Sequence, residues 1–335
     1  MIEGRTMQGN GEDRDNDDAV RAAEFASPFD RPEWFDLLEA HGFAAGGRFD
    51  AGGSAGAATV RLPLRIEAPG HLAGLTNWYS FAIRPLWSPG GDRGAALADL
   101  FRALRARAAR LSLYPVRDGE QDEIIAALRA VGWRVKAAPA GDRHWLDLGD
   151  MGHDAWWAGR PGALRSTVQR KAKKGIVAIE ILTAFDAAAW AAYEAVYAAS
   201  WKPEEGDPAL LRAFAEMEGT RGTLRMGIAR IGEAAVAAQF WTVEDGTAFI
   251  HKLAHVEDSL KASPGTLLSA ALFRHVIEID GVKRVDFGTG DDAYKRDWMN
   301  RHDPLWRIEA FNLSRATAWE PALKAFARSL LRKDK

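Results

Sequence analysis

The period of hydrophobic positions changes twice between residues 247 and 290. Residues 247–254 alternate loosely between apolar and polar after Asp245-Gly246, which is typical of a strand. Apolar residues then recur at helical spacing from Leu267 to Val276, and Gly281 ends that helix. Residues 282–287 form a second β-rich run before a polar, glycine-containing turn. The pattern therefore predicts a strand, a helix and a second strand.

The helix has a recognisable start at Ser263-Pro264-Gly265. Serine is a preferred N-cap, and proline suits the first helical position because its missing N–H would have no partner there. A strand–helix–strand unit is a right-handed crossover, so the two strands should lie side by side or nearly so. Free amides and the helix dipole at such a start attract anions, most often phosphate. We predict an anionic ligand at residues 263–266; a helix start without a ligand is the alternative.

Before this unit the pattern predicts a mixed α/β lobe over residues 25–150. The predicted order is αββαβαββ: helix 32–41, strands 59–66 and 77–86, helix 95–110, strand 111–116, helix 120–130, and a hairpin of 133–137 with 144–148. Residues 46–58 are rich in Gly and Ala but lack the Gly-Lys-Ser/Thr ending of a phosphate-binding P-loop, so we predict a hairpin connection there. Residues 149–162, rich in Gly and Pro, mark the boundary.

A second lobe is predicted over residues 151–335, with broadly the same element order and no strict sequence repeat. Its further elements are helix 164–174, strand 176–181, helices 185–200 and 208–218, hairpin 224–230 with 234–243, strand 305–312 and a terminal helix 315–335. Each lobe is expected to be a mixed, mostly antiparallel sheet flanked by helices, an α/β (α+β) class. Residues 1–5 read as a protease-site scar, and residues 1–24 as a disordered leader.

Composition narrows the function classes. A chain of 335 residues with 47% hydrophobic and 27% charged residues fits two soluble domains. The net charge of −2 argues against nucleic acid as a partner, and the absence of Cys excludes disulfides, a thiolate nucleophile and a Cys zinc site. No apolar run approaches the roughly 20 residues that span a bilayer, and no secretory signal is present, so we expect a cytoplasmic protein.

Two basic segments each have two interpretations. The predicted helix 164–174 carries Arg165, Arg170, Lys171, Lys173 and Lys174, either as a solvated charged face or as a surface for a polyanionic cofactor or an RNA end. The basic end of the terminal helix is either a solvated cap on the second lobe or a contact with a membrane surface.

Several short motifs together resemble the GNAT superfamily of acyl-CoA-dependent N-acyltransferases. They are Arg165-Ser166-Thr167 with Arg170-Lys171, Ser200-Trp201-Lys202, Lys252-Leu253-Ala254-His255, residues 263–268, residues 286–290 and Tyr294-Lys295. The combination is similar to the two-lobed branch called CelD-like or FemAB-like. It covers about residues 163–312, and the first lobe resembles that branch by architecture only. The Gln/Arg-x-x-Gly-x-Gly/Ala pattern of ordinary GNAT enzymes is absent, and Ser-Pro-Gly stands in its place.

The resemblance implies acyl-CoA as co-substrate, an amine as acceptor, and neither a permanently bound cofactor nor a metal. This branch includes enzymes that acylate sphingoid bases, which implies a long-chain amine as one acceptor. FemAB-like relatives take their acyl group from aminoacyl-tRNA, so that donor is an alternative. A third alternative is a non-catalytic module that has kept the fold but has no enzymatic activity. Arg170, Lys171 and Lys295 would join residues 263–266 in holding the donor. Trp201, Lys202, Trp78 and Tyr79 would receive the acceptor between the lobes.

The chemistry needs a base for the amine, stabilisation of the thioester oxygen and a proton for the leaving thiolate. By resemblance, Tyr294 would supply that proton. The candidate bases are His255, His251 and Asp286, and we favour His255 because imidazole titrates near neutrality. Lys252, the fourth candidate catalytic residue, or Lys295 could instead pair with Asp286 and keep it ionised. Each residue could equally be an ordinary core or surface residue. His251 and His255 share no zinc ion on a strand, where four residues span about 13 Å.

Overall fold

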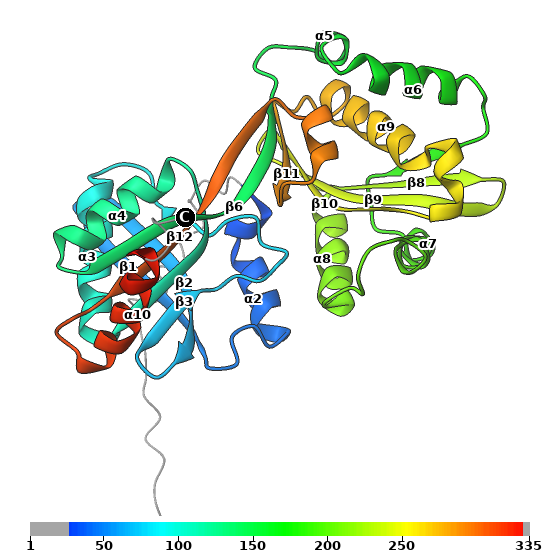
Figure 1. Cartoon of the computed structure of the whole chain (residues 1–335). Helices are drawn as coiled ribbons and strands as arrows, with labels where there is room; N and C mark the ends of the chain where they lie inside the picture. The colour runs from blue at the N-terminus through cyan, green and yellow to red at the C-terminus, as the bar shows by residue number, and fades with distance from the viewer. Residues whose placement is uncertain (1–26, 331–335) are drawn as a thin grey trace, which may run out of the picture. The chain divides into compact units, whose positions relative to one another are not determined.

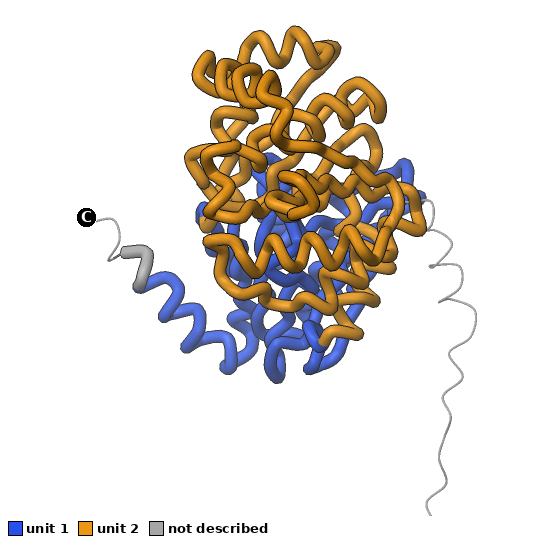
Figure 2. Tube along the Cα trace, turned by 90° about the vertical axis from the view of Figure 1, so that its right-hand side faces the viewer, with its two compact units in different colours: residues 1–25, 42–139, 306–335 blue, residues 26–41, 140–305 orange. Residues whose placement is uncertain are grey.

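The computed structural model describes residues 27–330 and shows two compact units. Of the described residues, unit 1 holds 42–139 and 306–330, and unit 2 holds 27–41 and 140–305 (Figure 2). This division is not contiguous, unlike the boundary at residue 150 expected from the sequence, because the long strands β6 (Arg134–Asp147) and β12 (Arg301–Phe311) run from one unit into the other. The predicted leader and the last residues of the terminal helix lie outside the described residues.

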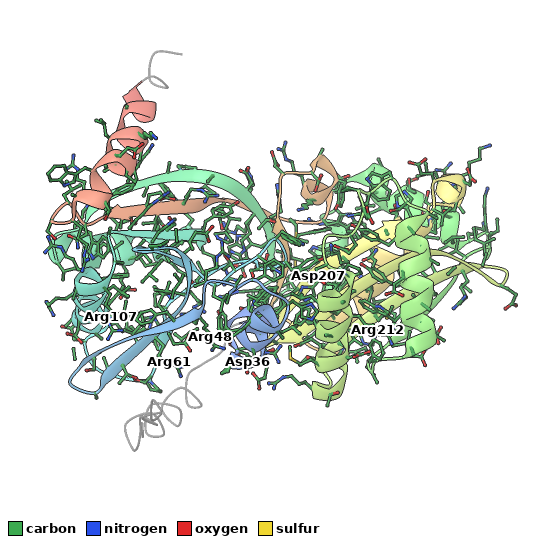
Figure 3. The ribbon with its side chains drawn as sticks, turned by 90° about the horizontal axis from the view of Figure 1, so that it is seen from below. Asp36, Arg48, Arg61, Arg107, Asp207 and Arg212 are labelled. Atoms are coloured by element: carbon green, nitrogen blue, oxygen red, sulfur yellow. The ribbon has the colours of Figure 1, made fainter. Side chains whose placement is uncertain are left out.

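In unit 1 the strands follow the order β1-β2-β3-β5-β12, with β4 paired to β2. These are β1 (Arg48–Ala55), β2 (Ala58–Ala68), β3 (His71–Gly74), β4 (Leu86–Trp87) and β5 (Arg110–Arg117). Helices α3 (Arg93–Arg107) and α4 (Glu120–Ala130) bury their apolar faces with these strands in one core. On the β1–β2 ladder, the guanidinium groups of Arg48 and Arg61 both bond Asp50, at 3.1 and 3.2 Å (Figure 3). The terminal helix α10 (Trp319–Leu330) follows β12.

Three sequence-based expectations in this region are wrong. Most of the Gly-rich range 46–58 is strand β1, and only residues 56–57 form the hairpin turn to β2. Gly53 is needed in β1 because a Cβ there would lie 2.4 Å from the Ala96 carbonyl oxygen of α3. Residues 77–86 are irregular up to β4, since the Asn77 side chain accepts the Tyr79 amide at 2.9 Å and forms a local turn. The predicted hairpin after residue 132 is the single strand β6, whose pairing with neighbouring strands overrides the local Pro and Gly signals.

In unit 2 the strands follow the order β6-β11-β10-β9-β8-β7. They are β7 (Ala178–Leu182), β8 (Leu224–Ile231), β9 (Ala234–Glu244), β10 (Thr247–His255) and β11 (Arg284–Thr289), beside the last part of β6. Helices α5 (His153–Ala158), α6 (Gly162–Ala172) and α9 (Pro264–Glu278) lie on one face, and α7 (Ala187–Ala198) and α8 (Pro208–Arg221) lie on the other (Figure 1). The predicted class, a mixed and mostly antiparallel sheet flanked by helices, is confirmed.

The predicted crossover is present as β10–α9–β11. The two strands pair in parallel from Thr247 with Arg284 to Phe249 with Asp286, and their register stops there. Beyond this point β10 continues against β9 and β11 against β6, so the carboxyl ends of the two strands diverge. A β-bulge between Ile250 and Lys252 leaves His251 as the extra residue of β10.

The first described segment, residues 27–41, belongs to unit 2, and a buried ion pair of Arg31 fixes it there. Arg31 precedes α2 (Pro32–Ala40), and its guanidinium donates to Glu218 of α8, with Glu244 3.4 Å away. Arg31 and Glu218 are both fully buried. Among residues 27–330, no helix is long and apolar enough to cross a membrane.

His251 should make the stability of unit 2 depend on pH. Its ring is packed among Phe29, Phe214 and Phe240, and its Nε2 lies 2.8 Å from the Thr242 hydroxyl oxygen. Burial lowers the pKa of His251 to about 3, against an opposing effect of Asp286.

In the unfolded chain His251 takes up a proton as the pH falls through about 6.5, whereas in the folded chain it stays neutral down to about pH 3. The contribution of neutral His251 to the free energy of unfolding is fully present above pH 6.5. It is lost as the pH falls toward 3, by at most about 1.4 kcal/mol per pH unit. The free energy of unfolding, measured with urea at several pH values between 7 and 4, should change less steeply with pH in His251→Gln than in the unmodified protein. An equal dependence on pH in both proteins would contradict this prediction.

Candidate active site

A cavity of about 340 Å³ opens in unit 2 where β10 and β11 diverge. Its walls come from the carboxyl end of β10, the first turn of α9, the segment after β11 and the start of α6. Seven of the residues singled out from the sequence line it: Trp201, His255, Ser263, Pro264, Gly265, Thr266 and Tyr294. The crossover predicted from the sequence thus places the start of α9 beside an open cavity.

The first turn of α9 presents main-chain amides to this cavity. The helix begins at Pro264, as predicted, and the Leu267 amide is bonded to the Ser263 carbonyl oxygen at 3.1 Å. The first N–H groups of a helix have no helical acceptor, and Pro264 has no N–H, so the amides of Gly265 and Thr266 remain for a ligand. Ser263 occupies the predicted N-cap position, but it is left-handed (φ 55°) and its side chain makes no capping hydrogen bond. That conformation turns the chain sharply from the preceding 3-10 turn, Glu257–Ala262, into the helix.

His255 lies directly against this helix start. Its ring packs on the Trp201 indole, with centroids 4.4 Å apart, and a Cβ placed on Gly265 would lie 3.2 Å from its Nδ1. Burial lowers the pKa of His255, Glu257 opposes that shift, and Lys202 adds to it. The imidazole is therefore neutral at pH 7, in the form that can accept a proton.

Tyr294 lines the same cavity. It belongs to a short 3-10 turn, Ala293–Asp297, and its ring packs edge-on against Phe287 at 5.6 Å. Burial raises the pKa of Tyr294, and Asp292 raises it further, so the phenol keeps its proton and can act as a donor. The Lys295 ammonium does not reach the cavity: it is buried and donates to the carbonyl oxygens of Thr289 and Gly290, at 2.7 and 3.1 Å. Lys295 thereby holds the turn that presents Tyr294.

Asp286 is fully buried and does not line the cavity. Its carboxylate accepts from Arg143 Nε at 2.8 Å and from the Gly288 amide at 3.0 Å. Arg143 of β6 thus takes the place that was expected for Lys252 or Lys295. The sequence holds no signal for this pair, because it depends on β6 lying beside β11, 143 residues apart in the chain.

Lys252 lies away from the cavity as well. The bulge at His251 places Lys252 on the α7 side of the sheet, where its ammonium bonds Glu205 at 2.8 Å and lies 5.5 Å from the Tyr197 ring centroid. Lys202 lines a second cavity on that side. Trp78, which is 59% exposed, and Tyr79, which is buried, belong to unit 1.

The basic helix 164–174, predicted from the sequence, is present as α6, and the exposed Arg170 lies on it. Leu164 of α6 lines the first cavity, and the Lys171 ammonium donates to the carbonyl oxygen of Lys261, two residues before Ser263. This contact places one cation of α6 near the start of α9, as an anionic ligand would require.

Gln239 is a site residue that the sequence interpretation missed. Its buried amide donates to the Gly265 carbonyl oxygen at 3.2 Å and to Ser269 Oγ at 2.7 Å, and it accepts from Trp241 Nε1 at 2.9 Å. These bonds fix the first turn of α9 on strand β9. A glutamine in the middle of the mostly apolar run 234–243 was the available signal, since a buried amide must find partners.

Two polar clusters in unit 2 have the residue types of a metal site: His153 with Asp154 and Glu278 on α5 and α9, and His144 with Asp291 and His302. Ligand atoms of His144, Asp291 and His302 lie within 4.8 Å of one another. Arg296 already bonds both oxygens of Asp291 at 2.8 Å, and His144 bonds the same carboxylate at 2.8 Å. These contacts account for the second cluster as a hydrogen-bond network that ties the loop after β11 to β6.

Comparison with known proteins identifies the fold around this cavity. Residues 162–296 match the family model described as an acetyltransferase (GNAT) domain. The solved structure of FemX is 10% identical, with a TM-score of 0.63 over 92% of this chain and 97% of that one. The C-terminal domain of a protein described as a lysylphosphatidylglycerol synthetase of Agrobacterium fabrum is 15% identical, with a TM-score of 0.55 over 88% and 92%. L-PGS from Bacillus licheniformis is 12% identical, with a TM-score of 0.54 over 91% and 98%. No curated protein matches the sequence.

Proposed function

The chain carries an acyltransferase domain of the GNAT superfamily over residues 162–296, and from this premise we propose that it transfers an acyl group from a coenzyme A thioester to a primary amine. The observation that carries the proposal is the cavity itself. Free helix amides, a neutral imidazole and a protonated phenol surround one space at the divergence of β10 and β11.

The start of α9 would hold the donor. Its pyrophosphate fits the amides of Gly265 and Thr266, because helix starts favour anions and these amides have no helical acceptor. Lys171 and the exposed Arg170 add positive charge on the neighbouring helix α6. The thioester arm would then lie between the diverging strands, where β10 has no register with β11 beyond Phe249.

The reaction would use two side chains that line the cavity, His255 and Tyr294, in turn. His255 takes a proton from the ammonium of the acceptor, and the free amine attacks the thioester carbonyl carbon to form the new C–N bond. The C–S bond breaks as the tetrahedral intermediate collapses, and the Tyr294 hydroxyl gives its proton to the leaving thiolate. The nitrogen of the intermediate loses its second proton through solvent to the Tyr294 phenolate, which restores the phenol, and His255 releases its own proton to solvent. Asp286, paired with Arg143, takes no part in these steps and keeps β11 and β6 in place.

We propose a long-chain amine as acceptor, such as a sphingoid base, and a cytoplasmic location. The alternative donor is aminoacyl-tRNA, which FemAB-like proteins use, and the fold similarity to FemX together with the basic helix α6 supports it. A donor screen separates the two: thiol release with acetyl-CoA and long-chain acyl-CoA, against a tRNA gel shift at low and high salt. Only RNA binding should weaken steeply with salt. If neither donor is used, the chain is a non-catalytic module.

Gly265→Trp tests the donor site directly. Since even a Cβ at position 265 would crowd His255 at 3.2 Å, an indole there must fill the space above the first turn of α9. We expect the Kd for the acyl-CoA that the screen selects to rise at least tenfold in calorimetry. Gly152→Trp is the matched control, because Gly152 precedes helix α5 and a Cβ placed on it would meet no described atom within 4 Å beyond its chain neighbours. Unchanged binding in Gly265→Trp would contradict the donor site.

A further inference from the structure

The terminal helix α10, predicted from the sequence, has no part in the proposed reaction. It belongs to unit 1 and packs on β12, where its Phe326 ring lies 6.1 Å from the ring of Phe311 and its Ala322 is buried in the same small core (Figure 1). The Lys136 ammonium of β6 also donates to the carbonyl oxygen of Ala325. These contacts fix one side of α10 to the strands of unit 1.

The apolar part of α10 extends beyond the side that unit 1 covers. Trp319 and Leu323, one helical turn apart, are 61% and 73% exposed. Leu313, in the turn after β12, is 45% exposed, and its carbonyl oxygen accepts the Trp319 indole N–H at 2.9 Å. This bond satisfies the one polar atom of the indole, so the ring can leave water without an unpaired donor. Leu313, Trp319 and Leu323 form what we call the apolar patch.

Positive charge accompanies the apolar patch. The exposed cations Arg315 and Lys324 lie within two residues of its leucines. The Arg315 guanidinium donates to the Ala106 carbonyl oxygen, a neutral group, so its charge is not compensated there. Lys324 pairs with Glu320, but a pair of exposed side chains is weak and can yield to another anion. From residue 313 to residue 335 the sequence has six Lys or Arg and two acidic residues, in a chain whose net charge is −2.

A membrane surface is the partner that fits this combination. Helices that lie on membranes present Trp and Leu side chains next to Lys and Arg. The cations bind anionic head groups, while their aliphatic stems lie along the apolar surface. An indole is favoured at head-group depth because it is apolar with one polar edge. The core of a protein interface is instead depleted in charged residues, and in lysine in particular, whereas cations here stand beside each leucine of the patch.

We propose that the apolar patch of α10 binds the surface of a membrane that contains anionic lipids. Leu313, Trp319 and Leu323 lie among the lipid head groups, and Arg315 and Lys324 contact the lipid phosphates. The helix rests on the membrane without crossing it, in agreement with the lack of a helix of sufficient apolar length among residues 27–330. This contact does not depend on acyl transfer, because none of the five residues lines the catalytic cavity.

Vesicles of phosphatidylglycerol and phosphatidylcholine in equal parts are the probe, and co-sedimentation of the full chain is the measurement. Leu323→Glu should weaken vesicle binding about tenfold or more, because an apolar side chain is lost and the new carboxylate is repelled by anionic lipid. Ile279→Glu is the matched control, since Ile279, at the end of α9 in unit 2, is 72% exposed and receives the same charge. Lys324→Gln should weaken binding to these vesicles severalfold and leave the weaker binding to pure phosphatidylcholine vesicles unchanged.

Loss of vesicle binding in Leu323→Glu, with full binding in Ile279→Glu, supports the membrane contact whether or not a thioester is consumed. Equal binding of these two variants overturns it, as does an unmodified protein that sediments with neither kind of vesicle. Binding to pure phosphatidylcholine as tight as to the mixture overturns the role of anionic lipid. Self-association without vesicles that is lost in Leu323→Glu and kept in Ile279→Glu would assign the apolar patch to a second copy of this chain, and would overturn the membrane contact as well.

Discussion

Replacing His255 with alanine is expected to lower kcat of acyl transfer by a factor of about 10² to 10⁴, the usual contribution of a general base. The imidazole lies in the cavity against Gly265 and Trp201, and no other histidine among the residues lining that cavity can replace it. KM for the acyl-CoA should change little, because the amides of α9 and not the imidazole are assigned to the donor. Thiol release under saturating donor and acceptor is the measurement.

The pH profile distinguishes a base from a structural residue at position 255. Because burial lowers the pKa of His255, the neutral imidazole persists below pH 6.5, and the acidic limb of kcat/KM should fall below that pH. In His255→Ala this limb should disappear, and added imidazole should restore part of the rate. His153→Ala is the control, since His153 begins α5 and pairs with Asp154 and Glu278 outside the cavity. A full rate in His255→Ala would remove His255 from the mechanism.

The parts of the site that follow from local pattern could be predicted from the sequence. The periods of residues 247–287 predict β10, α9 and β11, and Ser-Pro-Gly predicts where α9 begins. Because β10 and the start of α9 are joined by one short turn, His255 and Gly265 must lie close together. These are local constraints, and they place the cavity with little help from the rest of the chain.

The contacts that depend on strand order could not be predicted. Arg143 pairs with Asp286 because β6 lies next to β11. The pattern of apolar and polar residues along the chain does not show which strands are neighbours in the sheet. Lys252 was expected near the site as a possible partner of Asp286. The extra residue at His251 changes the alternation and places Lys252 against Glu205 on the α7 side. A bulge of one residue leaves no distinct composition signal, although it changes which side chains reach the cavity.

Replacing Arg31 with methionine is expected to lower the free energy of unfolding by about 3 to 5 kcal/mol, the cost of breaking a buried ion pair. Arg31 is 1% exposed and Glu218 is 0% exposed, so loss of the guanidinium leaves a carboxylate without its cation and away from water. Thr223 Oγ1 still donates to Glu218 at 2.6 Å, which is too little to replace a charge. Urea unfolding at pH 7 measures the loss.

The double variant Arg31→Met with Glu218→Met removes both charges and separates this cause from lost packing. Since an apolar pair of similar volume often equals a buried ion pair in stability, the double variant should recover most of the loss. Glu244, 3.4 Å from the Arg31 guanidinium, loses the same cation in both variants, and burial already raises its pKa. If Arg31→Met lowers the free energy of unfolding by less than about 1 kcal/mol, which is the contribution of an exposed ion pair, Arg31 does not fix the first described segment to α8.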